Sequence, residues 1–140
     1  MKKLFIVLFS MSLMVFVLTS FAQDSKTVEE KVDSKEVVNV EVYYFHGTRR
    51  CETCKAVGNV SKGVVEDKYG DNENVSFIEI DFDQPGNEDL VEKFEVTSSS
   101  LYVYNQTDLI NLTTYAFQYA KTNPDKLRNK LKSTINKNFK

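Results

Sequence analysis

The sequence predicts an α/β fold, a three-layer domain in which helices cover both faces of a central mixed sheet of about four strands. Two observations support this prediction. Stretches rich in β-branched and aromatic residues, typical of buried strands, alternate with stretches of helical periodicity, and no internal repeat interrupts that order. The order is strand, helix, strand, helix, strand, room for one further strand, and then helices.

The chain opens with a stretch typical of a cleaved export signal. Two lysines precede an apolar run over residues 4–18, and Ser20-Phe21-Ala22 fits a small-x-small cleavage pattern. We interpret residues 1–22 as a signal peptide, because the apolar run is shorter than the ~20 residues of a spanning helix. An uncleaved membrane anchor is the alternative. Cleavage would leave a bacterial periplasmic or secreted chain with no membrane attachment.

The composition after residue 22 favours one globular domain. Residues 23–35 include seven charged residues in thirteen, so we expect a flexible leader followed by a single domain over 36–140. Signal removal takes away Lys2 and Lys3 and moves the formal net charge from −2 to −4, which argues against a nucleic-acid partner. Both cysteines lie in one tetrapeptide, which excludes a small fold stapled by several disulfides.

The first strand and the first long helix are the clearest elements. Residues 37–45, VVNVEVYYF, are β-branched and aromatic, as expected for a largely buried strand. After a turn through Gly47, residues 51–69 place Cys54 and a series of valines at helical spacing, and Gly70 ends the helix. Two internal glycines lower its helix propensity by up to ~1 kcal/mol each. Packing against the sheet must therefore hold this helix.

The rest of the chain alternates in the same way. The predicted elements are a strand over 75–83, a turn over 84–86, a short helix capped by Asn87, a strand over 100–105, a turn over 105–108, a helix capped by Asn111, and a last helix that starts at Asn123-Pro124. Apolar residues spaced four apart in the last helix predict that one of its faces is buried.

Cys51 and Cys54 form a Cys-x-x-Cys pair directly after the first strand, at the start of the long helix. This spacing brings the two sulfur atoms within bonding reach. Unpaired N–H groups at a helix start favour a thiolate at Cys51, the form that attacks a disulfide. We expect Arg49 and Arg50 to lower the Cys51 pKa further and Glu52 to oppose them.

This pattern predicts thiol–disulfide exchange with a protein partner. The Cys51 thiolate attacks a partner disulfide, and Cys54 then resolves the mixed disulfide; the reverse sequence oxidises the partner. The alternative is an inert structural disulfide, which would close a very short loop and contribute little stability. A redox-inactive interaction domain is a third interpretation.

His46 is the only histidine and lies five residues before Cys51. It could accept a proton from a thiol or act as a third metal ligand, although a histidine at a strand end is often a hydrogen-bonded surface residue. Cys51, Cys54 and His46 fall short of a four-ligand zinc site, but two thiolates could hold a soft ion such as Cu(I). Metal binding is thus a second hypothesis, which a dimer pooling ligands would favour. Asp81 and Asp83, which precede Pro-Gly, are interpreted as solvated turn residues.

Residues 37–135 resemble the thioredoxin-like superfamily in the order of strand, Cys-x-x-Cys, helix and later elements. More narrowly, YYFHGTRRCETCKAV, SSSLYVY and NLTTYAFQYAKTNPDKL look like the exported thioredoxin-like proteins of the nitrophenyl compound nitroreductase subunit ArsF family. The resemblance implies a thioredoxin-like fold, with Cys51 as nucleophile, Cys54 as resolving cysteine and their disulfide as the redox centre. The family label implies electron delivery to another subunit. No glycine-rich flavin or nicotinamide fingerprint occurs, so we expect no bound cofactor.

Three positions depart from the superfamily pattern. Arg50 replaces an aromatic residue, Glu52-Thr53 replaces Gly-Pro, and Ser99 or Ser100 occupies the position of a cis-proline. A serine there adds a hydroxyl and a backbone donor but loses the ring that shields the sulfurs. These departures argue against general thioredoxin activity and favour a narrow partner range, or metal capture by less shielded thiols.

Overall fold

A computed structural model describes residues 38–138, so the predicted signal peptide over 1–22 and leader over 23–35 lie outside the described residues. The elements along the chain are β1 (Val40–His46), α1 (Glu52–Tyr69), β2 (Val75–Asp81), α2 (Glu88–Lys93), β3 (Ser100–Tyr104), β4 (Leu109–Asn111), α3 (Thr113–Tyr119) and α4 (Pro124–Lys137). Among the helices of residues 38–138, none has the length and apolar character needed to cross a membrane.

The four strands form one mixed sheet in the order β2-β1-β3-β4. β1 pairs with β2 in parallel, with His46 opposite Asp81 at the shared carboxyl end. β1 pairs with β3 in antiparallel fashion, and β3 continues through a turn into β4. A parallel pair needs a long crossover between its strands, and α1 supplies it. The carboxyl ends of β1 and β2 therefore lie side by side, next to the start of α1.

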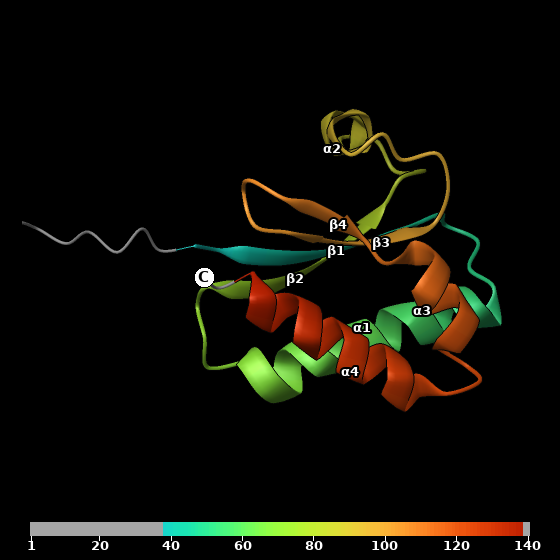
Figure 1. Ribbon diagram of the computed structural model, residues 1–140. Coiled ribbons are helices and arrows are strands. Elements are labelled where there is room, and N and C mark those ends of the chain that lie inside the picture. The colour runs from blue at the N-terminus through green and yellow to red at the C-terminus, as the bar shows by residue number, and fades with distance from the viewer. Residues whose placement is uncertain (1–37, 139–140) are drawn as a thin grey trace, which may run out of the picture. The chain divides into compact units, whose positions relative to one another are not determined.

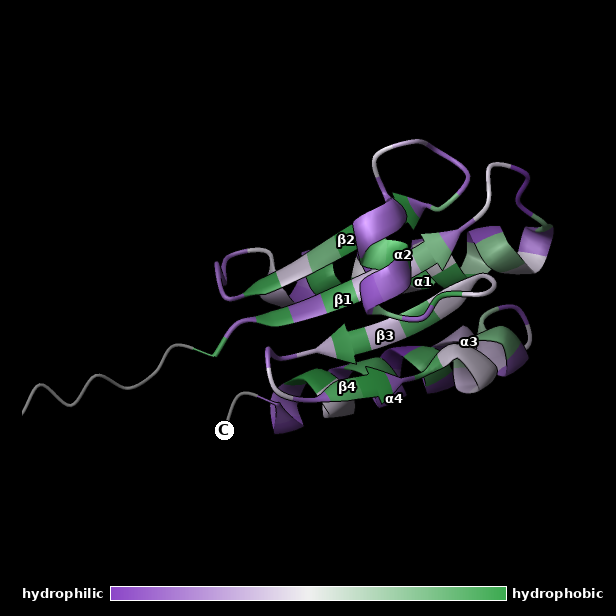
Figure 2. Ribbon diagram, turned by 90° about the horizontal axis from the view of Figure 1, so that it is seen from above, coloured by the Kyte–Doolittle hydropathy of each residue, from purple (hydrophilic) through white to green (hydrophobic). Residues whose placement is uncertain are grey.

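Helices cover both faces of this sheet, as Figure 1 shows, with α1, α3 and α4 on one face and α2 on the other. Successive side chains of a strand point to opposite faces. Accordingly Val42 and Tyr44 join the core under α1 and α4, whereas Tyr43 and Phe45 pack with Phe94 on the α2 face. The outward side of α2 is mostly hydrophilic, while the strands are mainly hydrophobic (Figure 2). The predicted three-layer α/β fold is confirmed, and it is consistent with a thioredoxin-like arrangement.

Element ends differ from the sequence predictions at a few positions. The second strand ends at Asp81 rather than at residue 83. Asn87 precedes α2 but makes no side-chain cap; its Nδ2 atom donates to the Asp81 carbonyl instead. Asn111 is the last residue of β4, and Leu112 is the residue that precedes α3. The predicted helix cap at Asn111 was therefore wrong by one residue, although its side chain accepts the Thr113 N–H at 2.9 Å.

Candidate functional site

Cys51 and Cys54 lie at the start of α1, beside the carboxyl end of β1. Cys51 is the N-cap of the helix, with extended backbone at φ −72° and ψ 166°. Its Sγ atom accepts the backbone N–H of Cys54 at 3.2 Å and lies 2.7 Å from the Cys54 Sγ atom. Both residues are free thiols, with Cys51 exposed and Cys54 half-buried. The sequence prediction that the two sulfurs lie close together is confirmed.

These contacts lower the pKa of Cys51 below the ordinary value of a thiol. The largest cause is the hydrogen bond from the Cys54 thiol, followed by the Cys54 backbone N–H, and desolvation opposes them. A thiolate is stabilised by donors that point at it, so Cys51 is the sulfur that these groups prepare for ionisation. Glu52, which was expected to oppose this shift, instead pairs with Lys55 at 3.1 Å.

Arg50 is engaged by the protein rather than directed at the thiols. Its Nη1 atom lies 2.7 Å from Glu79 Oε1, and its guanidinium lies 5.4 Å from the centroid of the Tyr44 ring. Neither Arg50 nor Arg49 is among the groups that lower the Cys51 pKa. The main causes of the lowered Cys51 pKa are thus local donors, and a carboxylate offsets the charge of Arg50. The expectation that both arginines lower this pKa stays a prediction.

A buried tyrosine, Tyr44, forms a hydrogen bond to the first turn of α1. Tyr44 has no exposed surface, and its hydroxyl donates to the Cys54 carbonyl at 2.7 Å. Burial raises the Tyr44 pKa to about 12, so the hydroxyl keeps its proton and remains a donor. Gly58 makes this arrangement possible, since a Cβ there would lie 2.6 Å from Arg50 Nη2 and 3.0 Å from Tyr44 Cε1.

Both ring nitrogens of His46 have partners other than the thiols. Its Nδ1 atom lies 2.9 Å from the Gly47 carbonyl and its Nε2 atom lies 3.3 Å from Glu79 Oε1. The residue is buried, with 8% of its surface exposed. Across residues 38–138, no group of three or more His, Cys, Asp or Glu residues is placed to hold a metal ion. The structure thus gives His46 a carboxylate partner and does not bring it into a three-ligand set with Cys51 and Cys54.

The serine loop before β3 is held by its own hydrogen bonds. The Ser100 hydroxyl donates to the Ser98 carbonyl at 2.6 Å, and Ser100 pairs with Phe45 at the start of the strand. Ser99 is half-buried and Ser100 is buried. No peptide bond within residues 38–138 is cis. The Ser100 hydroxyl therefore shapes its loop rather than binding either thiol.

Sequence reasoning missed the groups that fix the loop between β1 and Cys51. Thr48 Oγ1 donates to Asp81 Oδ2 at 2.8 Å and the Thr48 N–H donates to Asp83 Oδ2 at 2.9 Å. Gln84 Nε2 donates to the Thr48 hydroxyl at 3.2 Å. Asp81 and Asp83 were expected to be solvated turn residues. Their carboxylates also accept hydrogen bonds from Thr48 and so hold the loop that carries Cys51. The sequence carried one signal for these contacts. Two strands joined by a helix are expected to pair in parallel, which brings the residues after one strand close to the end of the other.

The pKa of Asp81 reflects this arrangement. Desolvation alone would raise it, but hydrogen bonds from Thr48 and from the Asp83 backbone, together with the nearby His46, outweigh that effect and place the pKa below its usual value. The carboxylate therefore stays charged and keeps accepting the Thr48 hydroxyl proton under mildly acidic conditions.

The fold and the site together define an α/β domain that presents an exposed dithiol at a helix start. No protein-family model matches the chain. No curated protein sequence matches it either. Three chains among the solved structures match; one, described as "Structure of a malarial protein", aligns with 57% of this chain and 93% of its own at 20% identity, with a TM-score of 0.40. A likeness at this TM-score carries no argument about function.

Proposed function

We propose that the protein is an exported thiol–disulfide oxidoreductase or electron-relay protein of the thioredoxin-like kind, which acts on a protein partner through Cys51 and Cys54. One observation carries the proposal. The exposed Cys51 Sγ accepts a backbone N–H at 3.2 Å and has a second thiol sulfur 2.7 Å away. An accessible, stabilised thiolate next to a resolving thiol is what disulfide exchange requires. The resemblance to the exported ArsF family supports the same class.

The reaction proceeds in two displacements. The Cys51 thiolate attacks one sulfur of the partner disulfide, forming a mixed disulfide and releasing the other partner sulfur as a thiolate that takes up a proton. The Cys54 thiol then loses its proton and attacks the Cys51 sulfur, which releases the second partner thiolate. The partner gains two electrons and two protons, and the Cys51–Cys54 pair becomes a disulfide. Run in reverse, the same steps oxidise a partner dithiol.

A purely structural role for the pair is less well supported. A disulfide between residues three apart closes a very short loop, which contributes little stability in a chain-entropy account. Structural thiols are usually buried and inert, whereas Cys51 is exposed. The lowered Cys51 pKa also favours reactivity over inertness.

Glutathione provides a defined test. The reduced chain, freed of residues 1–22, is equilibrated in buffers with graded ratios of reduced and oxidised glutathione, alkylated, and weighed by intact-mass spectrometry. We expect a reversible change of two protons in the native protein. We expect a stable glutathione adduct in Cys54→Ser, because nothing resolves it, and far less adduct in the matched control Cys51→Ser.

Two results would contradict the proposal. One is a cysteine pair that stays in one state across the whole range of ratios, and the other is an equal amount of adduct in the two serine variants. If the first result came with stoichiometric Cu(I) uptake by the native protein, capture of a soft ion would replace exchange as the function.

A further inference from the structure

A groove of about 450 Å³ opens beside α2, away from the dithiol helix. Its lining includes three apolar side chains and three carboxylates: Phe82, Val91, Val96, Glu88, Glu92 and Glu95. The three glutamates are exposed, Phe82 and Val91 are half-buried, and Val96 is buried. The groove therefore combines apolar surface that can still be covered with an acidic border.

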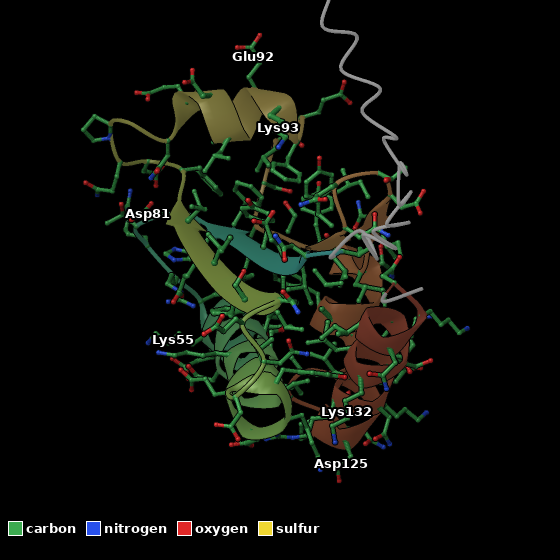
Figure 3. All side chains as sticks on the ribbon, turned by 90° about the vertical axis from the view of Figure 1, so that its left-hand side faces the viewer. Lys55, Asp81, Glu92, Lys93, Asp125 and Lys132 are labelled. Carbon is green, nitrogen blue, oxygen red and sulfur yellow. The ribbon has the colours of Figure 1, made fainter. Side chains whose placement is uncertain are left out.

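Within the part of the chain that the structure describes, no lysine or arginine forms an ion pair with a carboxylate of this border. Lys93, the only basic residue of α2, lies over the rings of Phe94 and Tyr104, at 5.3 and 4.7 Å from their centroids. Figure 3 shows Glu92 projecting outward from α2, with Lys93 on another side of the helix. None of the ion pairs formed within residues 38–138 includes a groove glutamate. The negative charge of the groove is thus available to a partner.

The groove begins next to the loop that carries the reactive thiol. A Cβ built on Gly47 would lie 3.3 Å from Phe82 Cε2, so the backbone of this loop packs against the Phe82 wall. Gly47 precedes Cys51 by four residues, which span at most about 14 Å when fully extended. A peptide joined to Cys51 can therefore reach the groove with a short run of extended chain.

We propose that the groove receives a segment of the partner protein in which an apolar side chain stands between lysines or arginines. This inference rests on the proposed function, because it places the segment about four to six residues from the partner cysteine that joins Cys51. The apolar side chain leaves water against Phe82, Val91 and Val96. Its basic neighbours meet the glutamates, and an acidic segment is disfavoured by like charge.

Activated peptides test the proposal on the reduced protein without residues 1–22. Each probe is a cysteine joined to thionitrobenzoate, and attack by Cys51 on the peptide sulfur releases that coloured thiolate. One probe is N-acetylcysteine amide; the others add four neutral residues and then Lys-Leu-Lys, Lys-Ser-Lys or Glu-Leu-Glu. At low salt we expect Lys-Leu-Lys to react about threefold to tenfold faster than Glu-Leu-Glu, with Lys-Ser-Lys between them. Added salt should shrink the charge effect.

A charge reversal locates the effect on the protein. Glu92→Lys should abolish most of the advantage of Lys-Leu-Lys and leave the rate with N-acetylcysteine amide unchanged. Glu73→Lys is the matched control, since it makes the same change of charge in the loop before β2 and should leave every rate ratio unchanged. If Glu92→Lys changed the oligomeric state instead of the probe rates, the occupant would be a second copy of the chain and the proposal would be overturned.

The remaining outcomes separate this inference from the function it extends. Equal rates for all extended probes, with a normal rate for N-acetylcysteine amide, would overturn the groove and leave exchange standing. No reaction of any probe with Cys51 would overturn both.

Discussion

The sulfur of Cys51 accepts the backbone N–H of Cys54 at 3.2 Å, while the two sulfur atoms lie 2.7 Å apart. Cys54 thus supplies two hydrogen-bond donors to the Cys51 sulfur, its backbone N–H and its thiol. The backbone donor is fixed by the helix, whereas the thiol donor is lost when Cys54 is replaced or loses its proton. The acidity of Cys51 therefore depends on the state of its neighbour.

We expect the Cys51 pKa to lie below the ordinary thiol value of about 8.5. The pH dependence of iodoacetamide alkylation measures it. Cys54→Ala should raise the pKa part of the way, because the Cys54 thiol is the largest cause of the shift and its backbone N–H remains. An unchanged pKa in Cys54→Ala would assign the shift to the backbone alone.

The same shift predicts how stability changes with pH. Because folding lowers the Cys51 pKa, the thiolate contributes stability that is fully present above the pKa of the unfolded chain and is lost as the pH falls through the folded pKa. Urea unfolding of the reduced protein across this window should show stability rising with pH. Cys51→Ser should remove that slope.

Tyr44→Phe should destabilise the protein by about 0.5–1.5 kcal/mol, since it removes a buried hydrogen bond to the Cys54 carbonyl. Urea unfolding measures the loss. Tyr43→Phe is the matched control: its hydroxyl donates to Glu41 Oε2 at 3.1 Å, a half-exposed carboxylate that water can satisfy. Equal effects of the two substitutions would mean that the Cys54 contact contributes nothing specific.

Thr48→Val should loosen the loop before Cys51, because it removes the donor to Asp81 and the acceptor for Gln84. The Asp81 pKa is lowered in the folded state, so its contribution is present above the ordinary aspartate pKa and is lost as the pH falls through the folded value. The deficit of Thr48→Val should accordingly be largest near neutral pH and shrink in acid. Unfolding measured at several pH values tests this, with Thr107→Val, in an exposed turn, as the control.

Gly58→Ala and Gly63→Ala should have opposite effects. Each substitution raises the helix propensity of its position by up to ~1 kcal/mol. At Gly63 the nearest atom to a new Cβ is Arg128 Nη1 at 3.7 Å, an ordinary contact, whereas at Gly58 the methyl group would meet Arg50 at 2.6 Å and Tyr44 at 3.0 Å. Thermal unfolding should show stabilisation at Gly63 and destabilisation at Gly58. Stabilisation at both positions would mean that Arg50 moves aside freely.

The local elements of the fold were accessible to sequence reasoning because they depend on periodicity. Valines at helical spacing predicted the buried face of α1, where Val57, Val60, Val64 and Val65 are buried. The β-branched stretch over 37–45 predicted β1 for the same reason. Element ends were less accessible, because the Asn87 side chain donates to the Asp81 carbonyl instead of capping α2. Asn111 accepts the Thr113 N–H at the start of α3 but is itself the last residue of β4.

The dithiol itself was also predictable, since two residues separate its cysteines. Its surroundings were not. Glu79 and Arg50 lie 29 residues apart in the sequence and form an ion pair, and Thr48 meets Asp81 and Asp83 across 33 and 35 residues. Such contacts depend on which strand ends become neighbours. For each of these residues the sequence contains several side chains that could pair with it, so the actual partner cannot be predicted from the local sequence.

The position of β1 in the middle of the sheet affects how the dithiol responds to a bound partner. This strand is hydrogen-bonded along both edges, to β2 and to β3, so its amide protons should exchange with solvent only when the whole domain opens. The chain that leads to Cys51 is thus anchored in the slowest-exchanging segment. When a protein is attached through Cys51, we therefore expect any backbone movement near the dithiol to occur in the five residues between β1 and α1 and not in β1 itself.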